Sequence, residues 1–174
     1  QGQCLIYTAD GETSVVDCGG AQDESGELAA RYLETNGVFR VDRLILTHLD
    51  ADHCNGAAQL LSRIRVDVLY LPLPAIREDG AMLRTIREAA REAGTQIKFV
   101  REDTEFLTKD GCITILGPDL RESGNNGGLC VLASHEKYDI LITGDLSQNA
   151  EYRLLSRYDL QDVELLVAGH HGAA

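Results

Sequence analysis

Apolar and polar residues follow two periods along this chain, and together they predict many short strands interleaved with helices. Segments 3–8 and 13–18 are apolar and β-branched, and Asp10-Gly11 between them is a typical hairpin turn. Period-two or continuous apolar runs predict further strands at 41–46, 66–71, 97–100, 112–116, 129–133, 140–143 and 163–167. Helical spacing predicts helices from Ser25 to Asn36-Gly37, at 57–62, at 80–93, and after Gly144-Asp145.

Three of the predicted strands end in residues that can bind metal ions. The strand at 41–46 runs into Thr47-His48-Leu49-Asp50-Ala51-Asp52-His53, a later strand ends in Gly144-Asp145, and the last ends in Gly169-His170-His171-Gly172. Four metal-competent side chains within six positions would repel and desolvate one another unless a cation lay among them. Strand ends on one edge of a sheet converge, so the pattern predicts a divalent-metal site with room for two ions.

The geometry expected of the first segment is extended. Strand alternation would place residues 48, 50 and 52 on one side, and a turn at His53 would bring the second imidazole round to them. Asp17-Cys18-Gly19-Gly20, after an earlier strand, predicts a backbone turn close to another group, with Asp17 fixing that turn or serving as an ordinary strand-end Asx residue. His135, in a predicted hairpin turn, is interpreted as having no role in the site.

Composition limits the classes of function. A length of 174 residues predicts one domain, and 44% apolar with 25% charged residues is ordinary for soluble proteins. The net charge of −12 repels the phosphate backbone of nucleic acids at long range and argues against tight binding of duplex DNA. Bound cations would neutralise part of that negative charge. Arg77, Arg84, Arg87 and Arg91 allow a nucleic-acid contact, but interleaved Glu88 and Glu92 favour a solvated helix face.

The five cysteines, at 4, 18, 54, 112 and 130, are predicted to be free thiols, most of them buried. Cys54 adjoins His53 and is interpreted as a space-filling neighbour in preference to a ligand or nucleophile. The glycine-rich loop 117–128 is expected to be a mobile rim.

In the order and spacing of its motifs, the chain resembles the metallo-β-lactamase superfamily, most closely the soluble domain of ComEC-type DNA-uptake (competence) proteins. The resemblance rests on His48-x-Asp50-x-Asp52-His53, Gly144-Asp145 and Gly169-His170-His171-Gly172, with Asp17-Cys18-Gly19-Gly20 similar to an early turn of that superfamily. It implies an α/β (α+β) fold, a four-layer αββα sandwich with two mixed sheets, spanning 1–174 as a single domain.

The resemblance also implies a ligand set. His48 and Asp50 would hold one ion, Asp52, His53 and one of His170/His171 the other, and Asp145 would bridge them. Asp52 and Asp145 are the implied catalytic residues, Asp17, Gly19 and Gly20 support the site, and Asn125 and Asn126 contact substrate. Most superfamily members have His where Asp50 stands, and this harder site favours manganese, with zinc or magnesium as alternatives. A further family His before Gly144 is missing.

The function implied is a metal-dependent phosphodiesterase that degrades single-stranded DNA during uptake, within the extracytoplasmic part of a bacterial membrane channel. Two alternatives stay open at this point. One is a small-molecule hydrolase acting on a lactam, thioester or lactone, which the acidic surface favours. The other is a non-catalytic docking domain, which the missing His and the terminal Ala173-Ala174 favour.

Overall fold

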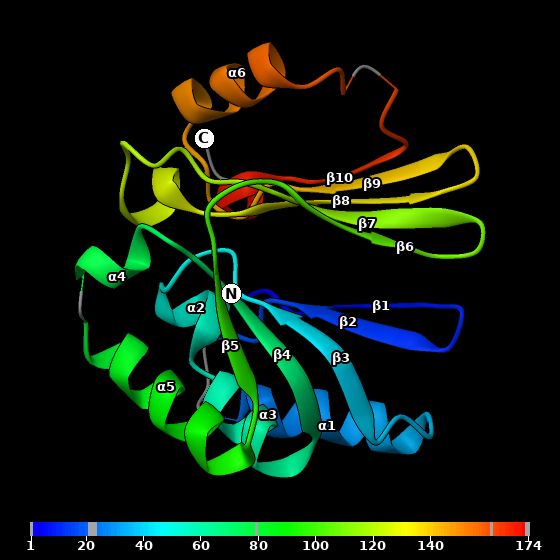
Figure 1. The fold of residues 1–174 in the computed structure, drawn as a ribbon, viewed down its shortest axis with the longest axis vertical. Helices are drawn as coiled ribbons and strands as arrows, with labels where there is room; N and C mark the ends of the chain where they lie inside the picture. The colour runs from blue at the N-terminus through cyan, green and yellow to red at the C-terminus, as the bar shows by residue number, and fades with distance from the viewer. Residues whose placement is uncertain (1, 21–23, 79, 161, 173–174) are drawn as a thin grey trace.

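The protein is a four-layer sandwich in which two five-stranded sheets pack face to face and helices cover their outer faces (Figure 1). The computed structural model describes residues 2–20, 24–78, 80–160 and 162–172. This is the expected αββα architecture. Within the described ranges, no helix is long and apolar enough to cross a membrane.

The first sheet is mixed and has the strand order β1-β2-β3-β4-β5. β1 and β2 form the predicted hairpin, and Asp10 and Gly11 at its turn both have positive φ, as a tight hairpin turn requires. β2 through β5 are parallel, and α1, α3 and α5 cross between them on the outer face. The bounds are β1 Leu5–Ala9, β2 Glu12–Val16, α1 Ser25–Thr35, β3 Arg40–Ile45, α3 Ala57–Arg63, β4 Arg65–Pro72, α5 Ala81–Ala93 and β5 Gln96–Val100.

The second sheet has the order β10-β9-β8-β7-β6 and is antiparallel except for the β9–β10 pair. One helix, α6, covers its outer face (Figure 1). The bounds are β6 Thr104–Leu107, β7 Gly111–Leu116, β8 Cys130–His135, β9 Tyr138–Ile142, α6 Gln148–Arg157 and β10 Leu165–Val167. The two short 3-10 helices, η1 Gly124–Gly127 and η2 Gly169–Gly172, flank this sheet.

Both faces of the central strands are buried, which explains their continuous apolar runs. Along β3 and just beyond it, Leu44 and Leu46 pack with the helices of the first layer, while Ile45 points between the two sheets. A third core lies between the second sheet and α6, where Leu146 and Leu154 are buried. Parallel strands covered on both faces are expected to be apolar throughout.

Besides the two 3-10 helices, three of the described elements were not predicted: α2 (Ala51–Cys54), α4 (Ala75–Glu78) and β6. The extended geometry expected for residues 48–53 is wrong, because the chain turns into α2 directly after Asp50. Two backbone donors from far along the chain hold this single helical turn: Gln3 N donates to Asp52 O at 3.0 Å, and Cys18 N to His53 O at 2.8 Å.

The strand register brings four chain segments to one edge of the sandwich. In the first sheet Val16 pairs with Ile45, so Asp17 and Thr47 leave the sheet at the same level. In the second sheet Ile142 pairs with Val167, which places Asp145 and His170 at a matching level. Leu129 N donates to Thr47 O at 2.8 Å and ties the two sheets together at this edge.

Candidate metal centre

Three predicted ligands meet at this edge: His48 after β3, His53 in α2 and Asp145 after β9. One ligand atom of each lies within 4.8 Å of the other two. His53 Nε2 is 3.2 Å from Asp145 Oδ1, and the His48 and His53 ring centroids are 4.2 Å apart. Two sheets and a one-turn helix therefore converge on one compact group of two imidazoles and a carboxylate.

The group is buried, and this is the observation that best supports a metal ion. His48 and His53 are 2% and 0% exposed, and Asp145 is 7% exposed. Among the described residues His48 Nε2 has no hydrogen-bond partner, which is costly for a buried polar atom. A divalent ion would satisfy it, and imidazole with carboxylate is a donor set that suits zinc and related transition metals. The residues present therefore fit such an ion.

Asp17 lies beneath the group and orients it. Its carboxylate is fully buried and accepts hydrogen bonds from Gln3 Nε2 at 2.9 Å and from the Thr47 backbone N at 2.7 Å. The Thr47 hydroxyl lies 2.9 and 3.0 Å from its two oxygens, and His53 Nδ1 is 2.8 Å from Oδ2. Metal-binding histidines commonly donate their second ring N–H to such a carboxylate.

This network selects the ring tautomers of both histidines. Asp17 only accepts, so His53 donates its Nδ1–H and keeps the Nε2 lone pair facing Asp145. The Thr47 hydroxyl has one proton, which it gives to Asp17; Thr47 Oγ1 then accepts Nδ1–H from His48 at 3.0 Å. His48 Nε2 is thereby left as a lone-pair donor in the group.

The two histidines are pushed in opposite directions electrostatically. Burial, followed by the neighbouring His53, lowers the pKa of His48, so its ring is neutral and ready to bind a cation. Burial also acts to lower the pKa of His53, but its hydrogen bond with Asp17 and the charges of Asp17, Asp145 and Asp52 outweigh that and raise it. A bound cation would take the place of the His53 proton.

The backbone is shaped to allow this packing. Asp17 adopts positive φ (59°), and the turn it begins runs against α2. A Cβ on Gly19 would lie 2.2 Å from Asp52 C, so only glycine permits the approach. Gly20 N donates to Asn55 Oδ1 and Gly20 O accepts from Asn55 Nδ2, at 3.0 and 2.8 Å, which locks the turn to the end of α2.

The remaining predicted ligands lie around the buried group. Asp50 is exposed, with Oδ2 3.8 Å from His48 Nε2, and Asp52 is half-buried on α2. His170 is partly exposed; its backbone N donates to Asp145 Oδ1 at 3.0 Å and its Nδ1 is 3.3 Å from Asp145 Oδ2. The side chain of His171 lies outside the described residues. Asp50, Asp52 and His170 thus lie at the rim of the buried group.

The predicted substrate-contacting asparagines belong to η1. Asn126 Oδ1 accepts from Ser147 N at 3.0 Å, so its side chain holds the turn that carries Asp145. Asn125 O accepts from Gly128 N at 3.1 Å within η1. The 117–128 loop is also attached to α4, since Arg77 Nη1 donates to Leu120 O at 2.9 Å and Gly124 N to Glu78 Oε1 at 2.7 Å.

The five cysteines are free thiols and most of them, Cys18, Cys54 and Cys130, are buried, as predicted. Cys54 Sγ donates to Asp50 O at 3.1 Å, and burial raises the pKa of its thiol to about 12. The interpretation of Cys54 as a space-filling neighbour agrees with this. Sequence reasoning gave no role to Thr47 or Gln3. For Thr47, the sequence feature that could have indicated its role is a hydroxyl directly before the first ligand histidine.

The family model of the metallo-β-lactamase superfamily matches residues 1–172 of this chain. ComE operon protein 3 of Bacillus subtilis is 30% identical over 144 residues, which are 82% of this chain and 18% of the relative. Competence protein ComA of Neisseria gonorrhoeae is 31% identical over 81% of this chain and 18% of its own length. The chain thus spans about a fifth of these relatives.

Solved structures agree on the fold. A protein from Thermotoga maritima that is described as a metallo-β-lactamase superposes with a TM-score of 0.66 at 14% identity, over 96% of this chain and 84% of the Thermotoga chain. Human tRNase Z, short form, superposes with a TM-score of 0.56 at 14% identity, over 95% and 70%. The superfamily match, the fold and the buried His/His/Asp group together support a metal-dependent hydrolase. On this evidence the chain belongs to the metallo-β-lactamase superfamily.

Proposed function

We propose that this chain is a metal-dependent phosphodiesterase that hydrolyses single-stranded DNA during DNA uptake. The observation that carries the proposal is the buried group of His48, His53 and Asp145 in a chain whose curated relatives include competence proteins. The chain spans only about a fifth of those relatives. We therefore propose that it is the extracytoplasmic part of a larger bacterial membrane channel.

Each residue group has a defined task in this proposal. His48, His53 and Asp145, with Asp50, Asp52 and His170 around them, would hold two divalent ions, of manganese or zinc. When bound, such ions supply Lewis acidity and lower the pKa of water. Asp17 and Thr47 keep both histidines in the tautomer that binds cations, and we assign the half-buried Asp52 to orienting the water nucleophile.

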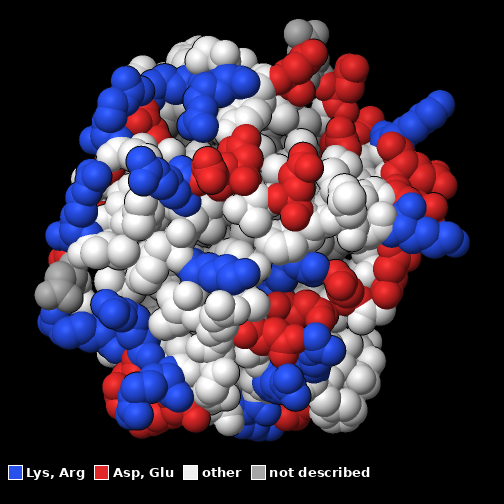
Figure 2. All heavy atoms as spheres, viewed as in Figure 1, with Lys and Arg blue, Asp and Glu red and all other residues white. Residues whose placement is uncertain are grey.

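One observation favours a small-molecule hydrolase on the same scaffold. The net charge of −12 repels a polyanion at long range. The charges are unevenly distributed, however: Figure 2 shows Lys and Arg side chains gathered along the left edge, over α6, α4 and α5. A strand of DNA approaching from that edge would meet positive side chains first, so the overall charge does not decide against it.

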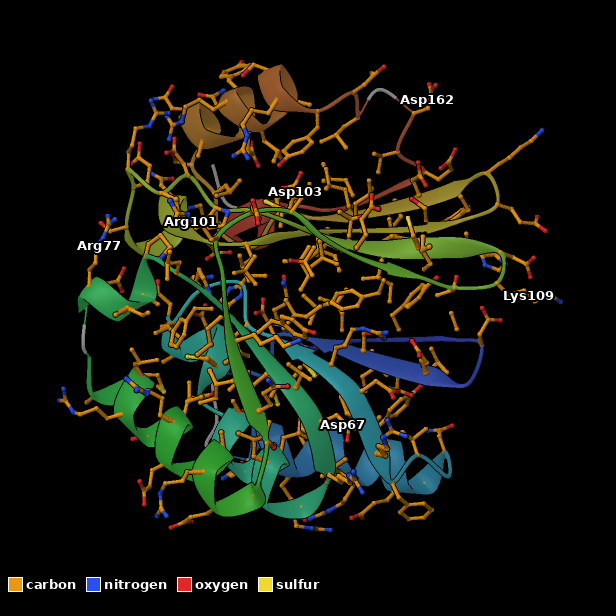
Figure 3. The ribbon with its side chains drawn as sticks, in the orientation of Figure 1. Asp67, Arg77, Arg101, Asp103, Lys109 and Asp162 are labelled. Atoms are coloured by element: carbon orange, nitrogen blue, oxygen red, sulfur yellow. The ribbon has the colours of Figure 1, made fainter. Side chains whose placement is uncertain are left out.

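The test is hydrolysis of end-labelled single-stranded DNA with manganese, zinc or magnesium, and with chelator. We expect metal-dependent cleavage that Asp145→Asn abolishes and that the matched variant Asp162→Asn, in the exposed α6–β10 connection (Figure 3), leaves unchanged. Activity lost in chelator must return when metal is restored. A folded, metal-loaded protein that cleaves lactam or thioester substrates and no DNA would replace this proposal by the small-molecule one.

A further inference from the structure

A hollow of about 140 Å³ lies between the 117–128 loop and α6, outside the group of metal ligands. Its rim carries the guanidinium groups of Arg121, Arg153 and Arg157, and its floor is made largely by Cys130, Leu146 and Leu154. The floor is apolar and adds no charge, because burial raises the pKa of the Cys130 thiol to about 12. Charge interactions over such a floor are stronger than in open water.

The hollow shares two walls with the metal centre. Leu146, which lines it, directly follows Asp145. Gly128 also lines it, and a side chain there would lie 3.6 Å from His48 Cβ. Asn126, a third lining residue, accepts from Ser147 N beside the same turn. A ligand in the hollow is therefore only one layer of residues away from the proposed ions.

The arginines of α6 are unequally neutralised. Arg153 Nη2 pairs with Glu122 at 2.9 Å, and Arg153 Nε is 3.7 Å from Asp119 Oδ2. Arg121 also pairs with Asp119, a carboxylate that lines the hollow and whose pKa this guanidinium lowers to about 2. Arg157, by contrast, donates to the Gly117 carbonyl at 3.3 Å and to the Tyr158 hydroxyl at 3.0 Å, and makes no salt bridge to any described carboxylate.

Arg153 and Arg157 are also four residues apart on one helix. Glu122 and Asp119 offset the charge of Arg153, so Arg157 is the guanidinium of this pair whose charge is left for a ligand. The positive edge continues below the hollow, where Figure 3 shows Arg77 and Arg101 on the same side of the molecule. Arg101 and Arg157 line one further shallow depression together with the acidic Glu102 and Asp103.

We propose that this hollow is a phosphate-binding subsite, in which Arg157, with Arg153 beside it on α6, holds the phosphate of a nucleotide next to the scissile one in a single strand. Arginine suits this task because its planar fork binds phosphate oxygens in pairs. A flexible single strand can place one phosphate in a recess beside the ions, whereas the rigid backbone of a duplex cannot. The inference deepens the proposed function and rests on it for the identity of the substrate.

The experiment measures binding and hydrolysis separately. In chelator at low ionic strength, fluorescence anisotropy of a labelled oligothymidylate gives Kd for the wild type, Arg157→Gln, Arg157→Lys and Arg31→Gln, the last being an exposed arginine on α1. With metal, the same proteins are assayed for hydrolysis of the oligonucleotide and of bis(p-nitrophenyl) phosphate, a diester too small to reach the hollow.

We expect Arg157→Gln to weaken oligonucleotide binding about ten- to a hundredfold, as loss of hydrogen bonds to a charged group does. The slope of log K against log salt should fall by about 0.7, the value for one phosphate of a single strand. KM for the oligonucleotide should rise while hydrolysis of the small diester stays unchanged. Arg157→Lys should recover only part of the affinity, and Arg31→Gln should behave as the wild type.

Three results would overturn the inference: no measurable binding by the wild type, equal loss in Arg157→Gln and Arg31→Gln, or equal loss on both hydrolysis substrates. Failure of the proposed function looks different, because then the wild type hydrolyses neither diester, and the binding comparison still decides on the subsite. Arg153→Gln, with its fold checked by circular dichroism, provides an independent second variant.

Discussion

Replacing Thr47 by valine removes one hydroxyl from the centre of the buried network and conserves the shape of the side chain. Thr47 is 0% exposed, and its Oγ1 lies 2.9 Å from Asp17 Oδ2 and 3.0 Å from His48 Nδ1. The variant therefore loses a hydrogen bond to a buried carboxylate and leaves the His48 Nδ1–H without an acceptor. No cavity is created, since valine and threonine are nearly isosteric.

The expected cost in unfolding free energy is about 2–4 kcal/mol. Loss of a hydrogen bond to a charged group costs roughly 1.5–3 kcal/mol, and a buried unsatisfied donor about 1–3 kcal/mol. The total should fall below the sum of the upper limits, because Asp17 keeps three donors, from Thr47 N, Gln3 and His53. Metal affinity should fall about 10- to 100-fold, as loss of a ligand's supporting hydrogen bond does.

Urea unfolding of the metal-free protein measures the stability term, and competition with a chromophoric chelator measures zinc and manganese affinity. Thr95→Val is the matched control: Thr95 is buried, its Oγ1 donates to the Val66 carbonyl at 2.8 Å, and it lies outside the network. We expect it to cost about 1 kcal/mol and to bind metal normally. If Thr47→Val bound metal as tightly as Thr95→Val, the tautomer argument would be refuted.

Three further predictions concern the same edge and its surroundings. Gly19→Ala should destabilise the protein by more than about 2 kcal/mol and lower metal affinity, because its Cβ would overlap the α2 backbone at 2.2 Å. Gly80→Ala has open space around it and should cost only about 1 kcal/mol in urea unfolding, since Gly80 is the N-cap of α5. Alkylation followed by mass spectrometry should modify the exposed Cys4 in the native protein and Cys54 only after unfolding; rapid native labelling of Cys54 would contradict its burial. Saturating zinc should raise the thermal midpoint and chelator should reverse the shift, and equal midpoints would argue against an ion held by the folded state.

Local sequence was sufficient for the fold class and for where the ligands would meet. The predicted strands before His48, Asp145 and His170 exist, and the parallel register of β2 with β3 and of β9 with β10 brings their ends to one edge. These features depend on period-two and continuous apolar patterns and on strand ends, which are properties of neighbouring residues. The hairpin at Asp10-Gly11 was predictable for the same reason.

Contacts between distant segments decided the conformation of the ligand loop. The sequence predicted an extended arrangement at 48–53, and the chain instead forms α2, whose four residues are too few for propensity alone to stabilise. Gln3 N and Cys18 N supply hydrogen bonds to its carbonyls, and Gly19 packs against it. This placement buries His53 beside His48 and leaves Asp50 exposed at the rim.

The sequence by itself determined which side chains could bind a cation and that their strands would deliver them together. The resemblance already implied that Asp17 supports the site, but only the tertiary structure showed that Asp17 and Thr47 orient both histidines, because those hydrogen bonds join positions 30 and 36 residues apart. It also brought Arg121, Arg153 and Arg157 together around one hollow, which a net charge of −12 could not reveal. Total charge is a sum over the chain, whereas the field at a site depends on how the fold distributes that charge in space.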